Sequence, residues 1–263
     1  MQKNKLRILS LGAGVQSTTL ALMVKHGDLP MVDCAVFADT GWEPKAVYAH
    51  LDWLESVLPF TVHRVMEGNI REDLEAAHKG KRWLSIPAFS KGGGMVRRQC
   101  TKEYKIVPIR RKVRELAGLT RKKSPAFPVV EQWIGISMDE AIRMKPSQEA
   151  WQENIWPLID KGMTRRDCLK WLEERQYSVP PKSACIGCPY NSDARWAERR
   201  ENTPEEFAEA VAIDKMIRSG VRGMTAKLYL HRSMKPLDEV KFTADERGQP
   251  DLFNNECKGM CGV

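Results

Sequence analysis

The chain lacks any apolar run long enough to cross a bilayer, and its first residues lack the hydrophobic core of a secretory signal. It also lacks internal repeats and low-complexity tracts. These absences predict a globular cytoplasmic protein without a membrane partner. In that compartment we do not expect the 7 cysteines to form a disulfide framework, so clustered cysteines indicate metal or redox chemistry.

The composition is ordinary, but the charge is unevenly placed. With 263 residues, 42% hydrophobic and 29% charged, the chain is long enough for one α/β domain with an extension. Residues 97–123 hold eleven Lys or Arg and two Glu, a local charge of +9, which leaves about −1 for the rest of a chain of net charge +8. This basic segment fits a polyanion such as nucleic acid. A solvated helix face that also neutralises a nucleotide or an anionic cluster is the alternative.

Strand-like and helix-like segments alternate along the first part of the chain, which predicts βαβ units. The expected strands are Leu6–Leu11, Cys34–Ala38, Thr61–Val65, Gln132–Ser137 and, more weakly, Ile155–Ile159. The expected helices are Thr18–Lys25, Pro44–Val57, Arg71–His78 and Val107–Leu116. We therefore predict an α/β fold with a doubly wound, mostly parallel five-stranded sheet over residues 1–190. Residues 191–263 are expected to form a C-terminal helical extension and a cysteine-containing tail packed on it.

One stretch breaks this alternation. Lys79 to Gln99 contains Pro87 and three consecutive glycines and has no clear periodicity. It is expected to be a mobile loop near the site.

Ser10-Leu-Gly-Ala-Gly-Val-Gln-Ser17 lies where the first strand meets the first helix. Glycine permits positive φ and close approach to a ligand, and a helix N-terminus offers unpaired N–H groups to an anion. The candidate phosphate-binding residues are Ser10, Gly12, Ala13, Gly14, Gln16 and Ser17. The segment is not a Walker A loop, because no Gly-Lys-Ser/Thr follows. A Rossmann fingerprint, with Asp39 as the ribose-binding acid, is one alternative.

The same octapeptide resembles the pyrophosphate loop (PP-loop) of the adenine-nucleotide α-hydrolases, the HUP class of folds. Asp39-Thr-Gly-Trp42 resembles a turn of the phosphoadenosine-phosphosulfate (PAPS) reductase superfamily that lies beside the adenosine. The resemblance implies that an adenine nucleotide is held by the loop and by Asp39, Thr40 and Gly41.

The cysteines form two close pairs, Cys185-x-x-Cys188 and Cys257-x-x-x-Cys261. From the spacing alone, zinc and iron–sulfur coordination remain open. The segment around Cys100, from Arg97 to Ile109, resembles the first cluster segment of the superfamily. The resemblance implies a [4Fe–4S] cluster on Cys100, Cys185 and Cys188. Cys257 or Cys261 would supply the fourth ligand, or one iron would stay open.

The end of the chain has a second interpretation. Glu256-Cys257-Lys-Gly-Met-Cys261-Gly262 resembles the Glu-Cys-Gly tail of the superfamily's reductases, whose cysteine attacks sulfur. We expect Cys257 to act as a ligand and Cys261 as a catalytic thiol. Cys34 and Cys168 are expected to be buried packing residues.

The segment Gly135-Ile-Ser-Met-Asp-Glu-Ala-Ile-Arg143 follows the fourth expected strand. It therefore lies at the carboxyl edge of the sheet, where open α/β sheets bind ligands. It resembles the superfamily's Gly-x-Arg-x-x-Glu-Ser-x-x-Arg segment. The resemblance implies that Gly135 contacts the nucleotide and that Arg143 clamps a phosphate.

These features predict an iron–sulfur enzyme that binds ATP with Mg²⁺ and cleaves it between the α- and β-phosphates. Adenylation would activate an acceptor, nucleic acid being one candidate, for sulfur transfer; the sulfur or electron donor is not identified. A first alternative is a reductase of adenylyl or phosphoadenylyl sulfate that uses a tail cysteine. A second is a zinc-stapled module that binds nucleotide or nucleic acid without catalysis.

Overall fold

The computed structural model describes residues 5–91, 94–119 and 124–242. At its centre is a five-stranded sheet in the order β3-β2-β1-β6-β7, and all four strand pairings are parallel. The strands are β1 (Leu6–Ser10), β2 (Cys34–Asp39), β3 (Thr61–Met66), β6 (Val130–Ile134) and β7 (Gln152–Ile155). The predicted α/β fold class is confirmed.

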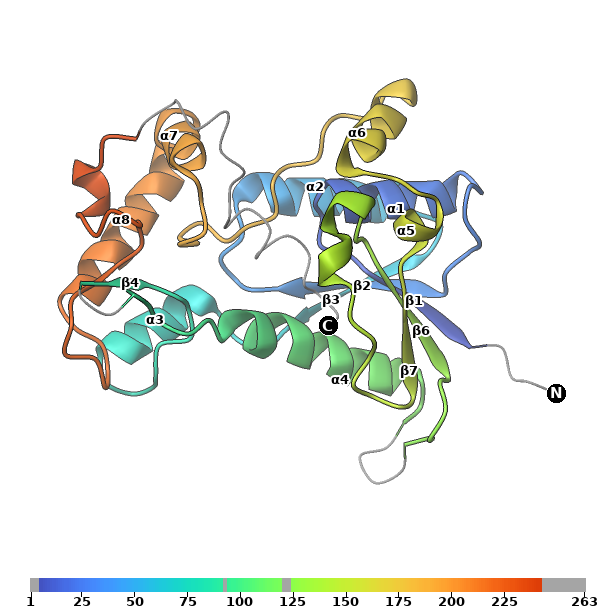
Figure 1. Ribbon diagram of the computed structural model, residues 1–263, viewed down its shortest axis with the longest axis horizontal. Helices are drawn as coiled ribbons and strands as arrows, with labels where there is room; N and C mark the ends of the chain where they lie inside the picture. Colours follow the sequence, from blue (N-terminus) through green and yellow to red (C-terminus); the bar gives the residue numbers. More distant parts are fainter. Residues whose placement is uncertain (1–4, 92–93, 120–123, 243–263) are drawn as a thin grey trace.

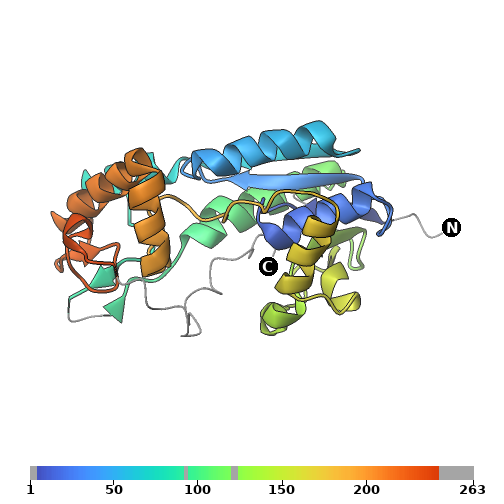
Figure 2. The same cartoon turned by 90° about the horizontal axis from the view of Figure 1, so that it is seen from above.

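Helices cover both faces of this sheet, as Figures 1 and 2 show. Alternate residues of each strand face opposite sides, so Leu9 and Phe37 belong to one core and Ile8 and Val36 to another. The first core includes residues of α1 (Val15–Lys25), α2 (Lys45–Val57), α5 (Pro157–Asp160) and α6 (Arg165–Glu174). The second includes residues of α4 (Val107–Leu116). The sheet is therefore doubly wound.

The strand order reverses between β1 and β6. The chain runs outward from β1 through β2 to β3, then returns through α4 to place β6 on the other side of β1. Ligands of doubly wound sheets bind at the carboxyl ends of the strands at such a reversal. The turn after β1 and the turn after β6 meet there, so the topology places both predicted binding segments at one point.

A further hydrophobic core lies beside the sheet, at the left of Figure 1. It joins residues of α3 (Ile70–His78), α7 (Asp193–Asn202) and α8 (Pro204–Arg218). Its buried members include Ile70, Tyr104, Trp196 and Leu228. This core therefore combines residues from both sides of the boundary expected at residue 190.

The segment from Lys79 to Gln99, expected to be a mobile loop near the site, contains β4 (Phe89–Ser90) and β5 (Gly94–Met95). These strands form a small antiparallel sheet with β8 (Leu228–Tyr229), in the order β5-β4-β8. The segment is therefore partly regular, and the sequence does not show this because the pairing partner lies far along the chain.

The last strand also differs from the expected one. Ile155–Ile159 was predicted as a strand, but β7 ends at Ile155 and Pro157 begins α5. Proline at the first turn suits a helix and interrupts a strand ladder. Three short helices complete the fold: η1 (Lys102–Ile106), η2 (Met138–Arg143) and η3 (Leu237–Glu239).

Candidate functional site

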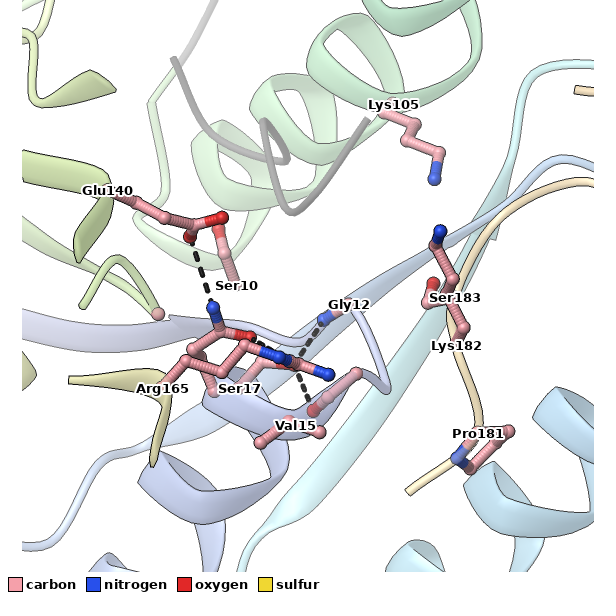
Figure 3. A pocket seen from close by; sticks show the side chains of 13 residues that line it. Ser10, Gly12, Val15, Ser17, Lys105, Glu140, Arg165, Pro181, Lys182 and Ser183 are labelled. Atoms are coloured by element: carbon pink, nitrogen blue, oxygen red, sulfur yellow. Dashed lines mark hydrogen bonds between the residues drawn. The ribbon is translucent and has the colours of Figure 1, made fainter. Parts of the chain in front are cut away.

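A pocket opens at the turn between β1 and α1, where the strand order reverses (Figure 3). Its empty space is about 650 Å³, part of which is open to solvent. Six of the predicted residues line it: Ser10, Gly12, Gly14, Gln16, Ser17 and Gly135. Gly14 caps α1 without a side-chain hydrogen bond, and the first turn of α1 carries no acidic residue. The helix N-terminus therefore offers its N–H groups and positive dipole end to an anion.

The two glycines of the turn are not required by its backbone. Only Ala13 has positive φ, at 53°, while Gly12 and Gly14 do not. Glycine was expected to provide the left-handed conformation, and this expectation is wrong: alanine holds it. A Cβ on Gly12 or Gly14 would meet nothing closer than 3.7 Å. The glycines thus leave space on the pocket side, as a closely approaching phosphate requires.

The two serines stabilise the turn. The Ser17 hydroxyl accepts from the N–H of Gly12 at 3.2 Å and lies 3.3 Å from the carbonyl oxygen of Gly14. The Ser10 hydroxyl accepts from the Gln132 side-chain amide at 2.6 Å. Ser17 therefore closes the loop on itself, and Ser10 fixes it to the neighbouring strand β6.

Gly135, at the end of β6, is required by packing. A Cβ there would lie 2.9 Å from the backbone nitrogen of Ser17 and 3.0 Å from its Cα. Only glycine lets the turn after β6 approach the N-terminus of α1 this closely.

A polar network forms one wall of the pocket. The Gln16 amide donates to Glu140 at 3.1 Å, and Arg165 donates to the Gln16 carbonyl oxygen at 3.1 Å. Arg143 pairs with Glu140 at 3.0 Å, and the side chains of both residues are more than 90% buried. Arg143, predicted to clamp a phosphate, is absent from the pocket lining, whereas Arg165 is part of it. Sequence reasoning missed Arg165, which no motif distinguishes from its neighbours.

The turn Asp39-Thr40-Gly41 begins at the last residue of β2 and lies outside the lining of this first pocket. The Asp39 carboxylate accepts from the N–H of Gly41 and from the hydroxyl of Tyr48, each at 2.7 Å. Gly41 has φ of 70°, and a Cβ there would collide with Asn69, so glycine is required at this position. Thr40 is fully buried and lines a second pocket.

Three predicted cysteine ligands, Cys100, Cys185 and Cys188, line this second pocket. The Cys185 Sγ atom lies 3.3 Å from the Thr40 hydroxyl. Gly187, between the paired cysteines, packs against the Trp42 ring, and any side chain there would collide with the indole. The C-x-x-C turn is therefore fixed against the turn that follows β2.

The donor set has the chemistry of an iron–sulfur or zinc site. Within the described ranges, however, no three Cys, His, Asp or Glu side chains approach closely enough to hold a single metal ion. The remaining candidate ligands, Cys257 and Cys261, lie outside the described residues.

Lys105 lines both pockets. It projects from η1 into the first pocket in Figure 3, and its Nζ atom lies 3.5 Å from Oε1 of Glu43. The same Glu43 oxygen accepts from the Thr40 hydroxyl at 3.1 Å and from the Cys185 thiol at 3.7 Å. Sequence reasoning missed Glu43 and assigned Lys105 no role. Their pairing joins segments 62 residues apart, and only the fold shows it.

Cys34 and Cys168 lie apart from these pockets in the two cores of the large sheet. Burial raises the pKa of the Cys34 thiol to about 11 and that of the Cys168 thiol to about 12. Both are therefore protonated and unreactive at neutral pH, as packing residues should be.

The helical part of the basic segment 97–123 is largely paired within the protein. On α4, Arg110 pairs with Glu149, Arg111 with Glu67, and Lys112 with Glu115. The side chain of Arg114 lies over the Trp151 ring. In the part of the chain that the structure describes, no helix is both long and apolar enough to cross a membrane.

Comparison with known proteins gives a likeness among solved structures. No protein-family model and no curated protein sequence matches the chain. Among solved structures, it is similar to the phosphoadenylyl-sulfate (PAPS) reductase of Candida auris, crystallised as a phosphate complex. The match has 14% sequence identity and a TM-score of 0.47, and it covers 66% of this chain and 75% of the other. The fold assignment above therefore depends on this chain's own strand order.

Proposed function

We propose that this protein is an adenine-nucleotide-dependent enzyme of sulfur chemistry. In this proposal an acceptor oxygen attacks the α-phosphorus of ATP, and pyrophosphate leaves. Sulfide then attacks the activated carbon, and the acceptor oxygen departs with AMP. Mg²⁺ bound with the nucleotide would offset the charge of the leaving pyrophosphate.

One observation carries the proposal: Lys105 lines both the pocket at the N-terminus of α1 and the pocket of the three cysteines. A nucleotide phosphate and a sulfur-bearing group would therefore be neighbours. The ammonium group of Lys105 would stabilise negative charge developing between them. Arg165 and Lys182, which also line the first pocket, would supply further positive charge.

The pocket geometry supports phosphate as the ligand. Gly12 and Gly14 leave space where side chains would project, and the amides of α1 lie beside it. The buried network of Gln16 and Glu140 fixes Arg165 without covering the glycines. We assign the phosphates to this pocket, and the adenosine to the neighbouring turn Asp39–Gly41.

A [4Fe–4S] cluster is the proposed group in the second pocket, held by Cys100, Cys185 and Cys188. Cys257 is proposed as the fourth ligand and Cys261 as the reactive thiol. Three cysteines around one pocket support this assignment, because thiolates are the ligands that such clusters require. When bound, the cluster would carry or deliver sulfur.

The nucleotide part is tested by incubating anaerobically purified protein with ATP, Mg²⁺ and sulfide, with and without added nucleic acid, and measuring pyrophosphate and AMP. Release of both, lost in Gly14→Ala, supports the proposal. Release of phosphate and ADP instead would contradict α–β cleavage.

The cluster part is tested by iron and acid-labile sulfide content and by the visible absorption spectrum. Cys185→Ser and Cys188→Ser should lose iron, whereas the matched controls Cys34→Ala and Cys168→Ala should retain it. A colourless wild-type protein with stoichiometric zinc would overturn the cluster and favour the zinc-stapled module.

A sulfonucleotide reductase is the second candidate. Arg98 and Lys105 both line the cysteine pocket and would suit a sulfate group beside the thiols. Sulfite release from adenylyl or phosphoadenylyl sulfate, abolished by Cys261→Ser, would favour this candidate over ATP cleavage.

A further inference from the structure

Two segments of the chain contain many cations and no acid. Residues 76–102 include seven Lys or Arg and neither Asp nor Glu. Residues 215–237 include six Lys or Arg and, again, no acidic residue. In a chain that is 29% charged, thirteen cations without one carboxylate form a concentrated positive field.

The fold places these two segments side by side. β4 of the first pairs with β8 of the second, through Phe89 with Tyr229 and Ser90 with Leu228. The end of α3 contacts the second segment as well: the N–H of Arg222 donates to the carbonyl oxygen of Ala77 at 3.1 Å. We call the described part of this unit, residues 76–91, 94–102 and 215–237, the basic lobe. It lies at one end of the molecule in both views (Figures 1 and 2).

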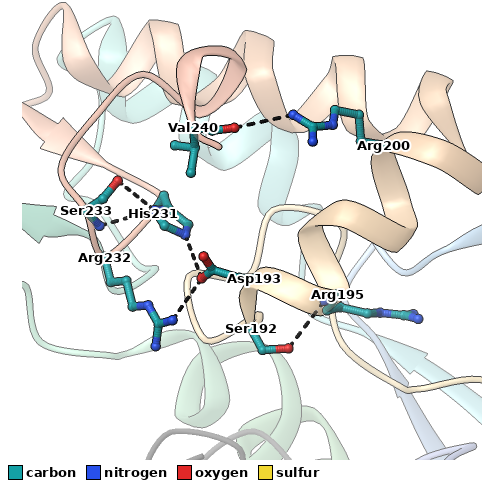
Figure 4. A network of polar contacts seen from close by, with 8 residues as sticks. All are labelled: Ser192, Asp193, Arg195, Arg200, His231, Arg232, Ser233 and Val240. Atoms are coloured by element: carbon teal, nitrogen blue, oxygen red, sulfur yellow. Dashed lines mark hydrogen bonds and ion pairs between the residues drawn. The ribbon is translucent and has the colours of Figure 1, made fainter. Parts of the chain in front are cut away.

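Acids from outside the lobe form ion pairs with some of its cations. Arg82 pairs with Asp73 and Glu103, and Arg218 pairs with Asp214. Arg232 pairs with Asp193, which also contacts His231 and so ties the lobe to the start of α7 (Figure 4).

An aromatic platform lies within this charge. The Trp83 side chain is 60% exposed, although tryptophan is usually well buried. Its position is fixed, because Gly223 packs against the indole so closely that any side chain there would collide with it. The guanidinium of Arg222 lies 5.4 Å from the ring centroid, and the neighbouring Lys79 and Lys81 are exposed. An ordered, exposed indole among cations suits stacking of an unpaired base.

The basic lobe also contributes residues to the second pocket, which the three cysteines line. Ile86 and Pro87, three and four residues after Trp83, line that pocket. The carbonyl oxygen of Ser85 accepts from the backbone N–H of Cys100 at 2.8 Å. A strand bound across Trp83 would therefore run towards the three cysteines.

We infer that the basic lobe binds single-stranded nucleic acid, with Trp83 stacking on a base and the surrounding cations holding phosphates. This inference rests on the proposed function, for which it names the acceptor class: a nucleotide of an unpaired strand. Shape and charge of this kind recognise a single strand without reading its sequence. A duplex, whose bases are already stacked, offers Trp83 no partner.

The experiment is fluorescence anisotropy of labelled 20-nucleotide oligo(dT) and oligo(U), with the full chain, across a salt series. We expect binding that weakens with salt, because bound cations release counterions. Trp83→Ala should weaken binding about tenfold, and Trp83→Phe should retain most of it. Lys81→Glu with Arg222→Glu should weaken binding and flatten the salt dependence. The two oligonucleotides separate DNA from RNA.

Matched controls sharpen the result. Phe127→Ala removes an equally exposed aromatic outside the lobe, and Lys25→Glu with Lys161→Glu reverses exposed charges on the other side of the fold. All should leave affinity unchanged. Equal affinity for a duplex of the same length, or full affinity in Trp83→Ala, would overturn the inference.

The two proposals fail separately. Pyrophosphate release from ATP by a protein that binds neither oligonucleotide would overturn the basic lobe's role and leave the proposed function standing. Oligonucleotide binding that depends on Trp83, in a protein that cleaves no ATP, would support the lobe and overturn the proposed function.

Discussion

The ammonium group of Lys105 lies 3.5 Å from a carboxylate oxygen of Glu43, and Lys105 lines both the pocket at the N-terminus of α1 and the pocket of the three cysteines. The Glu43 side chain is 1% exposed, and its other oxygen makes no hydrogen bond to any described residue. A buried carboxylate of this kind depends on its counter-charge. The ion pair of Lys105 and Glu43 therefore stabilises the fold, and its lysine also lines the candidate site.

Lys105→Met tests this dependence. Losing the ammonium group leaves Glu43 buried without its counter-charge, which should cost about 3–5 kcal/mol of unfolding free energy. The double variant Glu43→Gln with Lys105→Met should recover most of that loss, because no charge is then buried. Urea unfolding of the two single variants and the double variant measures the coupling. A Lys105→Met protein as stable as wild type would show that the pair contributes nothing.

Alanine substitutions at the glycines of the first pocket should show which glycines leave space for a ligand and which are required by packing. Gly12→Ala and Gly14→Ala fit the backbone and should unfold at the wild-type urea concentration, yet bind ATP at least tenfold more weakly. Gly135→Ala, by contrast, forces a Cβ against Ser17 and should cost about 1–3 kcal/mol of stability. Calorimetric titration with ATP and urea unfolding give the two readouts. Wild-type ATP affinity in Gly14→Ala would exclude this pocket as the phosphate site.

The sequence predicts the large sheet well because its signals are local. The first five residues of β2, from Cys34 to Ala38, are a continuous apolar run, and the turn from Ser10 to Ser17 carries its glycines and serines together. β7 was misplaced because Pro157 starts a helix within an apolar run. The small sheet was missed because Phe89 pairs with Tyr229, 140 residues away, and no local pattern shows such a pairing.

In the candidate site, too, the sequence predicts the features that depend on local patterns and misses those that depend on packing between distant segments. Motif residues such as Gly12 and Cys185 lie in pockets, as their local spacing indicates. Arg143 has the motif position, yet Glu140 pairs with it in the interior, and Arg165 from a later helix lines the pocket instead. The packing of η2 and α6 decides which arginine faces the pocket, and the sequence alone does not show this packing.

Arginine substitutions test that division of roles. Arg143→Met removes the partner of the buried Glu140 and should lower the unfolding free energy by about 3 kcal/mol or more. Arg165→Met leaves this ion pair intact and should chiefly weaken ATP binding, by about tenfold. Both quantities are measured on both variants. The unfolding free energy should fall in Arg143→Met, and the ATP affinity should fall in Arg165→Met. Equal losses of affinity at unchanged stability would instead assign both arginines to the ligand.

His50, at the interface of α2 with α1, makes the stability of the fold depend on pH. Its ring packs on Trp53 and its Nε2 atom lies 3.0 Å from the hydroxyl of Thr18 in α1. Burial lowers the pKa of His50 from 6.5 to about 4. The unfolded chain therefore takes up a proton as the pH falls through 6.5, while the folded protein resists protonation until about pH 4. Stability from this group is present above pH 6.5 and is lost between 6.5 and 4.

His50→Gln isolates this contribution from those of His63 and His231, whose pKa values are also lowered by burial. Because the ring is only partly buried, we expect wild type to lose about 1–2 kcal/mol more than the variant between pH 7 and pH 4.5. Glutamine keeps a hydrogen-bonding group near Thr18 but cannot titrate, so the folded contacts stay comparable. Urea unfolding at half-unit pH steps gives both curves. Parallel curves for wild type and His50→Gln would mean that His50 protonates equally in the folded and unfolded states, contrary to its packing between α1 and Trp53.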